Sequence, residues 1–383
     1  MLRAILKVFQ SALAATGIIG SRVRENQGHE DRETVSRVSL KSLSQQLGLS
    51  QTTVSRALNG FPEVSERTRE RVVAAARQMN YRPNNSAANL ATGRTGQIGH
   101  VIPLSQHMMI NPHFADFLAG AGEHYSQAGY DALLRVVSTQ DEEDVYRDFA
   151  GRNRVDGVVV HGPEVNDARI DLLRSLDVPF IVHGRSDTVD GDYSWLDVNN
   201  ARAFRRAVDC LVDLGHRRIA LVNGLETMNF AARRRAGFCE GLEANGLTID
   251  ATLMTSADMN EPYGYDATLG FLRLRNPPTA IIYASILPAM GGHRALSEAG
   301  QTLGEDVSVI TYDDQLSFLR PLETGGLPLF TSLRSSIQAA GRRAAQMLIE
   351  QITADDDTPR QELWEADLVL GRSTRPVRQS RAA

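Results

Sequence analysis

The sequence has few cysteines and no long hydrophobic run. These two features argue against disulfide-rich, zinc-binding and membrane-spanning proteins. Cys210 and Cys239 are the only two cysteines among 383 residues, and neither lies in a CxxC or Cys/His spacing. Neither a disulfide framework nor a zinc site is indicated, and isolated thiols suit a reducing compartment. Charged residues interrupt every apolar stretch before the roughly 18 residues that a membrane-spanning helix needs. We therefore expect a cytoplasmic protein with no membrane partner.

The sequence also lacks the short motifs that accompany common catalytic sites. It contains no GxSxG, HExxH, GxxxxGK[ST] or GxGxxG pattern, and its nine histidines show no metal-ligand spacing. Gly120 and Gly122 lie inside an amphipathic helical pattern, and not after a strand where glycines would surround a phosphate. We therefore expect a protein that is not an enzyme and that needs no cofactor or metal.

Charge is distributed unevenly along a chain whose net charge is −5. Residues 38–96 carry eight Lys or Arg residues against three Glu residues, so the rest of the chain is strongly acidic. A basic segment on an acidic body indicates that this segment alone meets nucleic acid phosphates. Residues 1–37 end in a polar run with too few apolar residues to pack, and we interpret them as a flexible extension or the product of an early start codon.

Three short helical patterns follow one another in the basic segment. Apolar residues recur at spacings of three and four in three groups, which begin at Leu40, Val54 and Val72. Ser50 and Ser65 stand where the N-caps of the second and third helices belong. The pattern predicts a compact three-helix head.

From Gln97 onward, apolar runs with β character alternate with amphipathic helical stretches. The predicted strands are 98–104, 132–137, 157–161, 180–183, 219–223, 280–284, 307–312 and 363–370, and helical stretches include 114–127, 201–214, 234–245 and 288–299. This alternation predicts parallel sheets with right-handed crossovers. The series restarts near Ile219, which indicates two similar lobes with a cleft between them.

Residues 40–84 read LKSLSQQLGLSQTTVSRALNGFPEVSERTRERVVAAARQMNYRPN, a stretch that closely resembles the DNA-binding head of the LacI/GalR family of bacterial regulators. The likeness continues through NPHF, VDGVVV, LGHRRIALVNG, RAGF and DVSVITYDD and covers all but the N-terminal extension. It implies an all-α helix-turn-helix head and a two-lobed α/β body of the periplasmic-binding-protein type with parallel sheets. The implied partners are double-stranded operator DNA, a small-molecule effector and a second copy of the chain.

A recognition helix needs one apolar face that packs on its partner helix and an opposite face that reaches base edges. Residues 51–58 have this form, because Val54 and Ala57 recur on one face. The resemblance implies operator discrimination by Gln51, Thr52 and Arg56, and phosphate contacts from Thr53, Ser55, Thr68, Tyr81 and Asn84. From the helical pattern alone, a solvated face of a protein-interaction domain is the alternative.

Residues 85–91 correspond to the family's hinge helix, which folds on DNA and inserts a leucine between base steps of the minor groove. Leu90 matches that leucine, and a core leucine at the domain junction is the alternative. Ala88 departs from the basic or amide side chain that many members carry there, which removes one contact with DNA.

The predicted ligand site combines residues from both lobes, and for each of them a salt bridge or a turn is the alternative. Phe114 matches the family's aromatic residue after the first strand, and His183 and Arg185 end the fourth strand. Arg234 matches the family's ligand-clamping arginine, and Asp313 its ligand-accepting carboxylate. An arginine and a carboxylate on opposite sides of a cleft bind vicinal hydroxyls by charge-assisted hydrogen bonds.

The pocket departs from the family pattern at Ser285 and Ile286, where many members have Asn-Asp, so polar contacts are lost from the second lobe. The VHGR run at the fourth strand is similar to that of α-glucoside regulators, and we expect an α-glucoside or a related di- or oligosaccharide as effector.

Together these features predict a ligand-controlled transcription regulator, and a repressor in particular, in four parts. They are a flexible extension over 1–37, a helix-turn-helix domain over 38–83, a hinge helix or linker over 84–96, and a two-lobed sensing domain over 97–383. A periplasmic sugar-binding protein is one alternative, and it leaves the basic head unexplained. A sugar-metabolising α/β enzyme is another, and it predicts turnover of the ligand.

Overall fold

The computed structural model describes residues 38–58, 61–81, 93–104, 112–138, 141–187, 193–312, 315–317, 323–324, 326–354 and 358–377. The chain divides after Asn84 into two compact units, which we call the head and the body. The predicted extension over 1–37 and the predicted hinge helix over 85–91 lie outside the described residues.

The head contains the three helices that the sequence predicts, α2 (Leu40–Leu47), α3 (Gln51–Leu58) and α4 (Glu66–Gln78). They enclose one small core in which Leu43, Val54 and Val72, one from each helix, are fully buried. The spacing of three and four residues places these side chains on the inner face of each helix.

Local capping explains where the head helices begin and end. Ser39 and Ser42 form a reciprocal capping box at the start of α2, and Gly48 ends that helix with a φ of 65°. Ser50 accepts a hydrogen bond from the amide of Thr53 at 3.0 Å, so the predicted N-cap of α3 is confirmed. The Oγ atom of Ser65 caps α4 in the same way. A left-handed residue after a helix favours glycine, because glycine has no Cβ to clash.

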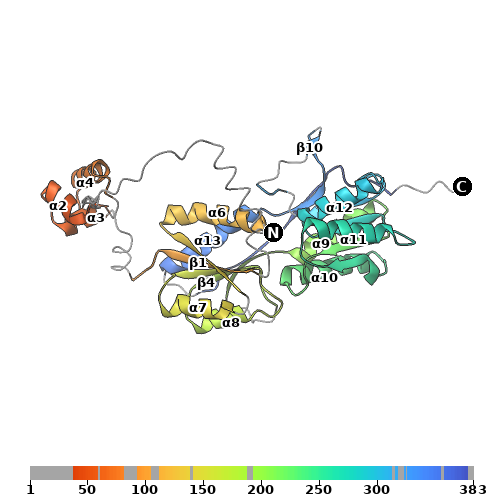
Figure 1. Cartoon of the computed structure of the whole chain (residues 1–383), viewed down its shortest axis with the longest axis horizontal. Coiled ribbons are helices and arrows are strands. Elements are labelled where there is room, and N and C mark those ends of the chain that lie inside the picture. Colours follow the sequence, from red (N-terminus) through yellow and green to blue (C-terminus); the bar gives the residue numbers. More distant parts are fainter. Residues whose placement is uncertain are drawn as a thin grey trace, which may run out of the picture. The chain divides into compact units, whose positions relative to one another are not determined.

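The first lobe of the body is a six-stranded parallel sheet in the order β13-β5-β4-β3-β1-β2. Its strands are β1 (Gln97–Pro103), β2 (Asp131–Val137), β3 (Gly157–His161), β4 (Phe180–His183), β5 (Ser194–Val198) and β13 (Gln361–Trp364). Its helices are α6 (Pro112–Ala128), α7 (Glu142–Gly151), α8 (Ala168–Ser175) and α13 (Ile337–Ala354). Figure 1 shows α6 and α13 on one face of this sheet and α7 and α8 on the other. Burial on both faces explains why β3 is apolar from Gly157 to Val160, before His161 at its end.

The second lobe is another six-stranded sheet, in the order β14-β12-β9-β8-β6-β7, and only β14 is antiparallel to its neighbour. Its strands are β6 (Ile219–Asn223), β7 (Met254–Ser256), β8 (Ala280–Tyr283), β9 (Ser308–Tyr312), β12 (Thr331–Arg334) and β14 (Asp367–Val369). Its helices are α9 (Asn200–Asp213), α10 (Asn229–Ala244), α11 (Glu261–Leu272) and α12 (Ile286–Glu298), with a 3₁₀ turn, η4 (Ala251–Leu253). A small hairpin of β10 (Glu323–Thr324) and β11 (Leu327–Pro328) lies between β9 and β12.

The prediction of one last strand over 363–370 is wrong. Two short strands occupy this stretch and belong to different sheets, because β13 pairs with β5 and β14 pairs with β12. Ala366, between them, is buried in the core of the second lobe and draws the chain across. The chain also crosses from β5 to α9 and from β12 to α13, so the second lobe begins at α9, ahead of the predicted restart near Ile219.

Helices α6 and α13 approach closely enough to require glycine at their contact. A Cβ atom on Gly120 would lie 1.8 Å from the carbonyl oxygen of Gln338, and one on Gly341 would lie 2.1 Å from that of Phe117. Gly122, two residues further along α6, faces a different direction, and a Cβ atom there would meet nothing within 4 Å. The two glycines of α6 therefore have different physical roles.

We predict that Gly120→Ala lowers the free energy of unfolding by about 1–3 kcal/mol, because the added methyl group forces the two helix backbones apart. Gly122→Ala is the matched control and should raise it by about 0.5–1 kcal/mol, since alanine favours helix. Urea unfolding followed by fluorescence measures both, because Trp195 and Trp364 lie in β5 and β13 of the same lobe. Equal effects of the two substitutions would contradict the close approach.

Candidate functional site

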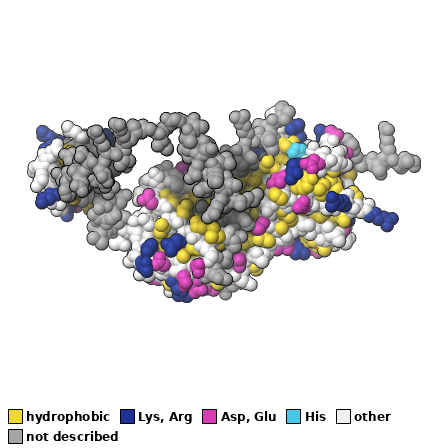
Figure 2. All heavy atoms as spheres, viewed as in Figure 1, with side chains coloured by type: hydrophobic (Ala, Val, Ile, Leu, Met, Phe, Trp, Pro, Cys, Tyr) yellow, Lys and Arg dark blue, Asp and Glu magenta, His cyan; other side chains and the backbone are white. Residues whose placement is uncertain are grey.

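The exposed face of α3 forms the part of the candidate site that lies in the head. Gln51, Thr52 and Arg56 are exposed, whereas Val54 and Ala57 are buried against the other helices. Figure 2 shows Lys and Arg side chains at the surface of the head on the face drawn. The helix thus presents amide, hydroxyl and guanidinium groups, the groups that hydrogen-bond base edges in the major groove.

Two predicted phosphate contacts lie in the first turns of helices. The Oγ1 atom of Thr53 is 2.8 Å from the capping Oγ of Ser50 at the start of α3. Thr68 stands in the same relation to Ser65 at the start of α4, with 2.9 Å between their hydroxyl oxygens. Helix N-termini attract anions through unpaired amides and the helix dipole, so both threonines are placed where a phosphate is favoured.

The other predicted DNA contacts are described only in part. Ser55 is half-buried on α3, and Tyr81 is half-buried after α4, where its amide donates to the carbonyl of Ala76 at 2.8 Å. Burial raises the pKa of the Tyr81 phenol above its ordinary value, so this side chain offers a neutral hydroxyl. Asn84 and Leu90 lie outside the described residues.

A cavity of about 430 Å³ lies between the two lobes of the body. Its walls come from segments that follow β1, β3, β4 and β5 in the first sheet and β6, β7, β8 and β9 in the second. Because the carboxyl ends of parallel strands meet at one edge of a sheet, ligands of open α/β folds bind there. The volume is in the range of small-molecule sites.

Aromatic and imidazole rings form the wall from the first lobe. Phe114 and Phe117 stand edge-on to the ring of His161, with centroids 5.1 and 4.9 Å apart. The ring of Phe117 also lies 4.6 Å from that of His183. These rings present flat apolar surface beside polar ring nitrogens, which is the combination that an amphipathic ligand needs.

Burial keeps the histidines of this wall neutral. It lowers the pKa of His183 to about 4 and that of His161 well below the ordinary value. Burial also lowers the pKa of His113 to about 4, helped by the charge of Arg234 and opposed by that of Asp116. A neutral imidazole carries one N–H donor and one acceptor nitrogen, so the wall offers both kinds of hydrogen bond without charge.

Arg234 of α10 is the buried cation of the opposite wall, with 7% of its surface exposed. Its Nε atom donates to Asn200 at 2.8 Å, and its Nη1 atom donates to the carbonyl of Ala284 at 2.6 Å. The guanidinium carbon lies 3.9 Å from the ring centroid of Tyr312 and 4.8 Å from that of Phe230. Hydrogen bonds and cation–π contacts therefore fix this guanidinium before any ligand arrives.

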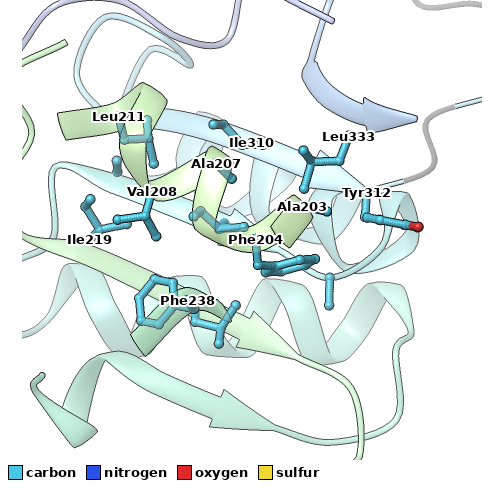
Figure 3. Packing of buried hydrophobic residues seen from close by; sticks show 14 of the residues in the cluster. Ala203, Phe204, Ala207, Val208, Leu211, Ile219, Phe238, Ile310, Tyr312 and Leu333 are labelled. Atoms are coloured by element: carbon cyan, nitrogen blue, oxygen red, sulfur yellow. The ribbon is translucent and has the colours of Figure 1, made fainter. Parts of the chain in front are cut away.

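The Arg234 site is built on the core of the second lobe. Phe204 and Tyr312 stack with centroids 6.1 Å apart, and both rings lie under the guanidinium. Figure 3 shows Tyr312 at the edge of this cluster, with its hydroxyl directed away from Ile310 and Leu333. The packed core thus sets the position of the group that faces the cavity.

An ionic network joins the lobes beside the cavity. Asp197 of β5 accepts hydrogen bonds from Arg185 at 3.0 Å and from Arg233 of α10 at 2.6 Å. Arg233 also pairs with Asp187 of the first lobe. Burial raises the pKa of Asp197 and outweighs the two guanidiniums, which lower it. One buried carboxylate therefore connects cations from both lobes.

Backbone hydrogen bonds form a second link between the lobes. The amide of Asn229 donates to the carbonyl of Pro163 at 3.0 Å, and the amide of Val165 donates to the carbonyl of Thr227 at 3.0 Å. These bonds pair the loop after β3 with the loop after β6 in a short antiparallel bridge. The loops on either side of the cavity are thus in direct contact.

The structure brings four of the five predicted ligand residues together, since Phe114, His183, Arg185 and Arg234 all line the cavity. The fifth, Asp313, lies outside the described residues, directly after the lining residue Tyr312. The lining residues that the sequence did not single out include His161, Asp197, Asn200, Arg233 and Tyr312. Their position in the sequence could have identified them, because each lies near the end of a strand or in the first turns of the helix that follows a strand.

The two positions that depart from the family pattern have different surroundings. Ser285 lines the cavity, and its Oγ atom accepts from the amide of Leu287 at 3.3 Å as the N-cap of α12. Ile286 is 1% exposed in the core of the second lobe. The serine keeps a polar group at the cavity, whereas the isoleucine contributes packing.

The described residues form neither a metal-binding cluster nor a membrane-spanning helix. No group of three or more His, Cys, Asp or Glu side chains there is placed to hold a metal ion. Within the same residues, no helix has both the length and the apolar character to cross a membrane.

Comparison with known proteins identifies both units. Residues 39–84 match the model of bacterial regulatory proteins of the lacI family, and residues 208–374 match that of the periplasmic binding protein-like domain. The HTH-type transcriptional regulator AglR of Rhizobium meliloti is 44% identical over 340 residues, which cover 89% of this chain and 95% of that protein. CelR of Thermobifida fusca, also an HTH-type transcriptional regulator, is 29% identical over 88% of this chain and 98% of its own length.

Solved structures agree with these matches. The complex of CelR with cellobiose superposes with a TM-score of 0.65 and 29% identity, covering 88% of this chain and 100% of that one. The lac repressor dimer bound to operator and the anti-inducer ONPF has a TM-score of 0.74 and 25% identity, with coverage of 88% and 99%. On this likeness in sequence and fold, the chain belongs to the LacI family of DNA-binding bacterial transcription regulators.

Proposed function

We propose that this regulator is a cytoplasmic homodimeric repressor that reads its operator through α3, and that a neutral sugar in the cavity controls its operator affinity. The fixed guanidinium of Arg234, opposite a wall of aromatic rings and neutral imidazoles, carries the proposal. A sugar has both the hydroxyls that a guanidinium binds and the C–H faces that aromatic rings cover.

The charges at the cavity favour a neutral ligand. Arg185 and Arg233 are already paired with Asp197, and His113, His161 and His183 of the cavity wall are neutral. A charged ligand that paired with Arg185 or Arg233 would displace Asp197 and leave this buried carboxylate unpaired, which is costly. A disaccharide, cellobiose, occupies the related CelR, and this supports a di- or oligosaccharide, an α-glucoside in our expectation.

The proposed contacts with DNA follow the geometry of α3. Gln51, Thr52 and Arg56 would read base edges, and Thr53, Ser55, Thr68, Tyr81 and Asn84 would bind phosphates. Leu90, in the predicted hinge, would enter the minor groove. The lac repressor dimer on its operator supports two heads on a near-palindromic site.

The first test is a gel shift of the full-length protein with the DNA upstream of its own gene and neighbouring genes. It is run at fixed salt, because phosphate contacts make the affinity salt-dependent, and with and without a panel of sugars. A discrete complex that one sugar dissolves or strengthens is the expected result. No sequence-specific complex with any of these DNA segments under any condition would refute the proposed operator control at these genes.

We predict that Arg56→Ala lowers the preference for operator over random DNA by about 1–3 kcal/mol, because one base contact is lost. Arg77→Ala is the matched control, since Arg77 is an exposed arginine in the last turn of α4. It removes the same charge and should leave the preference unchanged. Competition gel shifts measure the ratio, and an equal drop in both variants would remove Arg56 from the reading face.

We predict that Arg234→Ala weakens sugar binding at least about 100-fold, because a buried hydrogen-bonded charge is lost, while operator binding persists. Arg235→Ala provides the control, since this neighbour is 47% exposed, pairs with Glu226 and does not line the cavity. Calorimetric titration gives the affinity, and the gel shift shows that both variants fold. Sugar release of the operator by Arg234→Ala at the wild-type concentration would refute the assignment.

We predict that sugar affinity stays constant between pH 8 and pH 5.5. The pKa values of about 4 for His183 and His113 lie below this window, so these two imidazoles stay neutral within it. A phosphorylated ligand behaves otherwise, because it loses charge as the pH falls through about 6 and would then bind the arginines more weakly. Titration at three pH values distinguishes these ligand classes.

A further inference from the structure

A line of three buried side chains runs from the interior of the first lobe to the cavity. The Nε2 atom of His100 lies 3.1 Å from the hydroxyl oxygen of Tyr125, and its Nδ1 atom lies 2.9 Å from the Nε2 atom of His161. Tyr125 comes from α6, His100 from β1 and His161 from the end of β3. At most 5% of each side chain's surface is exposed. We call these three residues the relay.

Both imidazoles of the relay are neutral, which constrains their hydrogens. Burial lowers the pKa of His100 to about 3 and that of His161 well below its ordinary value. Each ring therefore has one N–H and one acceptor nitrogen. Since His100 uses both nitrogens, the relay has two arrangements, in which all hydrogens point either toward the cavity or toward Tyr125.

The hydroxyl of Tyr125 selects between the two arrangements. Its proton finds one acceptor among the described residues, the Nε2 atom of His100. If His100 instead donated to the phenol, the phenolic proton would stay buried without an acceptor, and such a loss is costly. Tyr125 therefore donates to His100, and the Nδ1–H group of His100 donates to the Nε2 atom of His161.

This order of donors leaves the hydrogen of His161 on its Nδ1 atom. The ring of His161 lines the cavity, and its Nδ1 atom makes no hydrogen bond to any residue that the structure describes. Phe114 and Phe117 stand edge-on to the ring and hold its orientation. The cavity thus receives an N–H donor whose direction is set by a tyrosine that does not itself line the cavity.

We propose that His161 binds an oxygen acceptor of the effector through its Nδ1–H group, and that Tyr125 and His100 are positioning residues that fix this tautomer. The inference rests on the proposed sugar-binding function and deepens it. It assigns to the ligand a ring, glycosidic or hydroxyl oxygen that accepts a hydrogen bond at the end of β3. An isolated neutral imidazole favours its Nε2–H tautomer, so the relay holds His161 in the less common form.

The direct test is ¹⁵N NMR of the full-length protein with labelled histidine, without ligand. We expect the His161 signals, identified by their loss in His161→Asn, to show a protonated Nδ1 atom. In Tyr125→Phe the ring should shift toward the Nε2–H form. The control Tyr146→Phe removes another buried hydroxyl of this lobe, one that bonds Glu142, and should leave His161 unchanged. A protonated Nε2 atom in the wild type would overturn the proposal.

The binding test uses maltose, trehalose and cellobiose in calorimetric titrations. Tyr125→Phe should weaken binding of the sugar that the wild type binds by about 3- to 10-fold, and His161→Leu should weaken it more. His161→Asn places an amide donor near the Nδ1 position without a link to His100, so it should restore most of the affinity lost in His161→Leu. In that background Tyr125→Phe should have no further effect.

The outcomes separate the relay from the proposed function. Equal losses from Tyr125→Phe in the wild type and in the His161→Asn background would assign Tyr125 a merely structural role and defeat the relay. Operator binding and thermal unfolding confirm that each variant folds. If the wild type binds none of the sugars, the proposed function fails for this panel, and the NMR result alone decides the tautomer.

Discussion

Strand direction is the constraint on which the rest of the body depends. In both sheets every strand except β14 runs parallel to its neighbours, so the carboxyl ends of the strands meet at one edge of each lobe. Those edges supply the loops and helix starts that line the cavity. Parallel pairing requires long crossovers, and because the crossover helices cover both faces, a central strand such as β8 is buried along its whole length. Core and ligand site therefore follow from the same pairing.

The buried charged groups at the cavity are held by partners within the protein. The guanidinium of Arg234 lies on the rings of Tyr312 and Phe230 and donates to neutral oxygens. Asp197 forms ion pairs with both Arg185 and Arg233. Desolvation makes an isolated charge expensive, so each of these groups depends on its partners for position. The site is consequently rigid in its charged parts before a ligand binds, and its remaining polarity comes from neutral groups such as His183.

Local signals explain what the sequence predicted and where prediction stopped. The head helices were predictable because capping serines and apolar spacing act within a few residues of one another. The positions of Phe114, in the first turn of α6, and of His183, at the end of β4, were predictable from the strand–helix order and family likeness. By contrast, the His100–His161 and Asp197–Arg233 pairs join segments 61 and 36 residues apart and leave no local pattern. The prediction of a single strand over 363–370 was wrong for the same reason, since alternation alone does not show which sheet a strand joins.

Because β13 and β14 are edge strands late in the chain, they are the last strands of their sheets to be synthesised. Each sheet is completed at one edge by residues after Arg360, and the segment up to Val377 is further fixed to β9 and to the end of α9. During synthesis, β5 and β12 therefore remain open edges until residues 361–369 have emerged from the ribosome. Unpaired strand edges are templates for aggregation. Both lobes of a nascent body thus keep one unpaired edge until this segment pairs with β5 and β12.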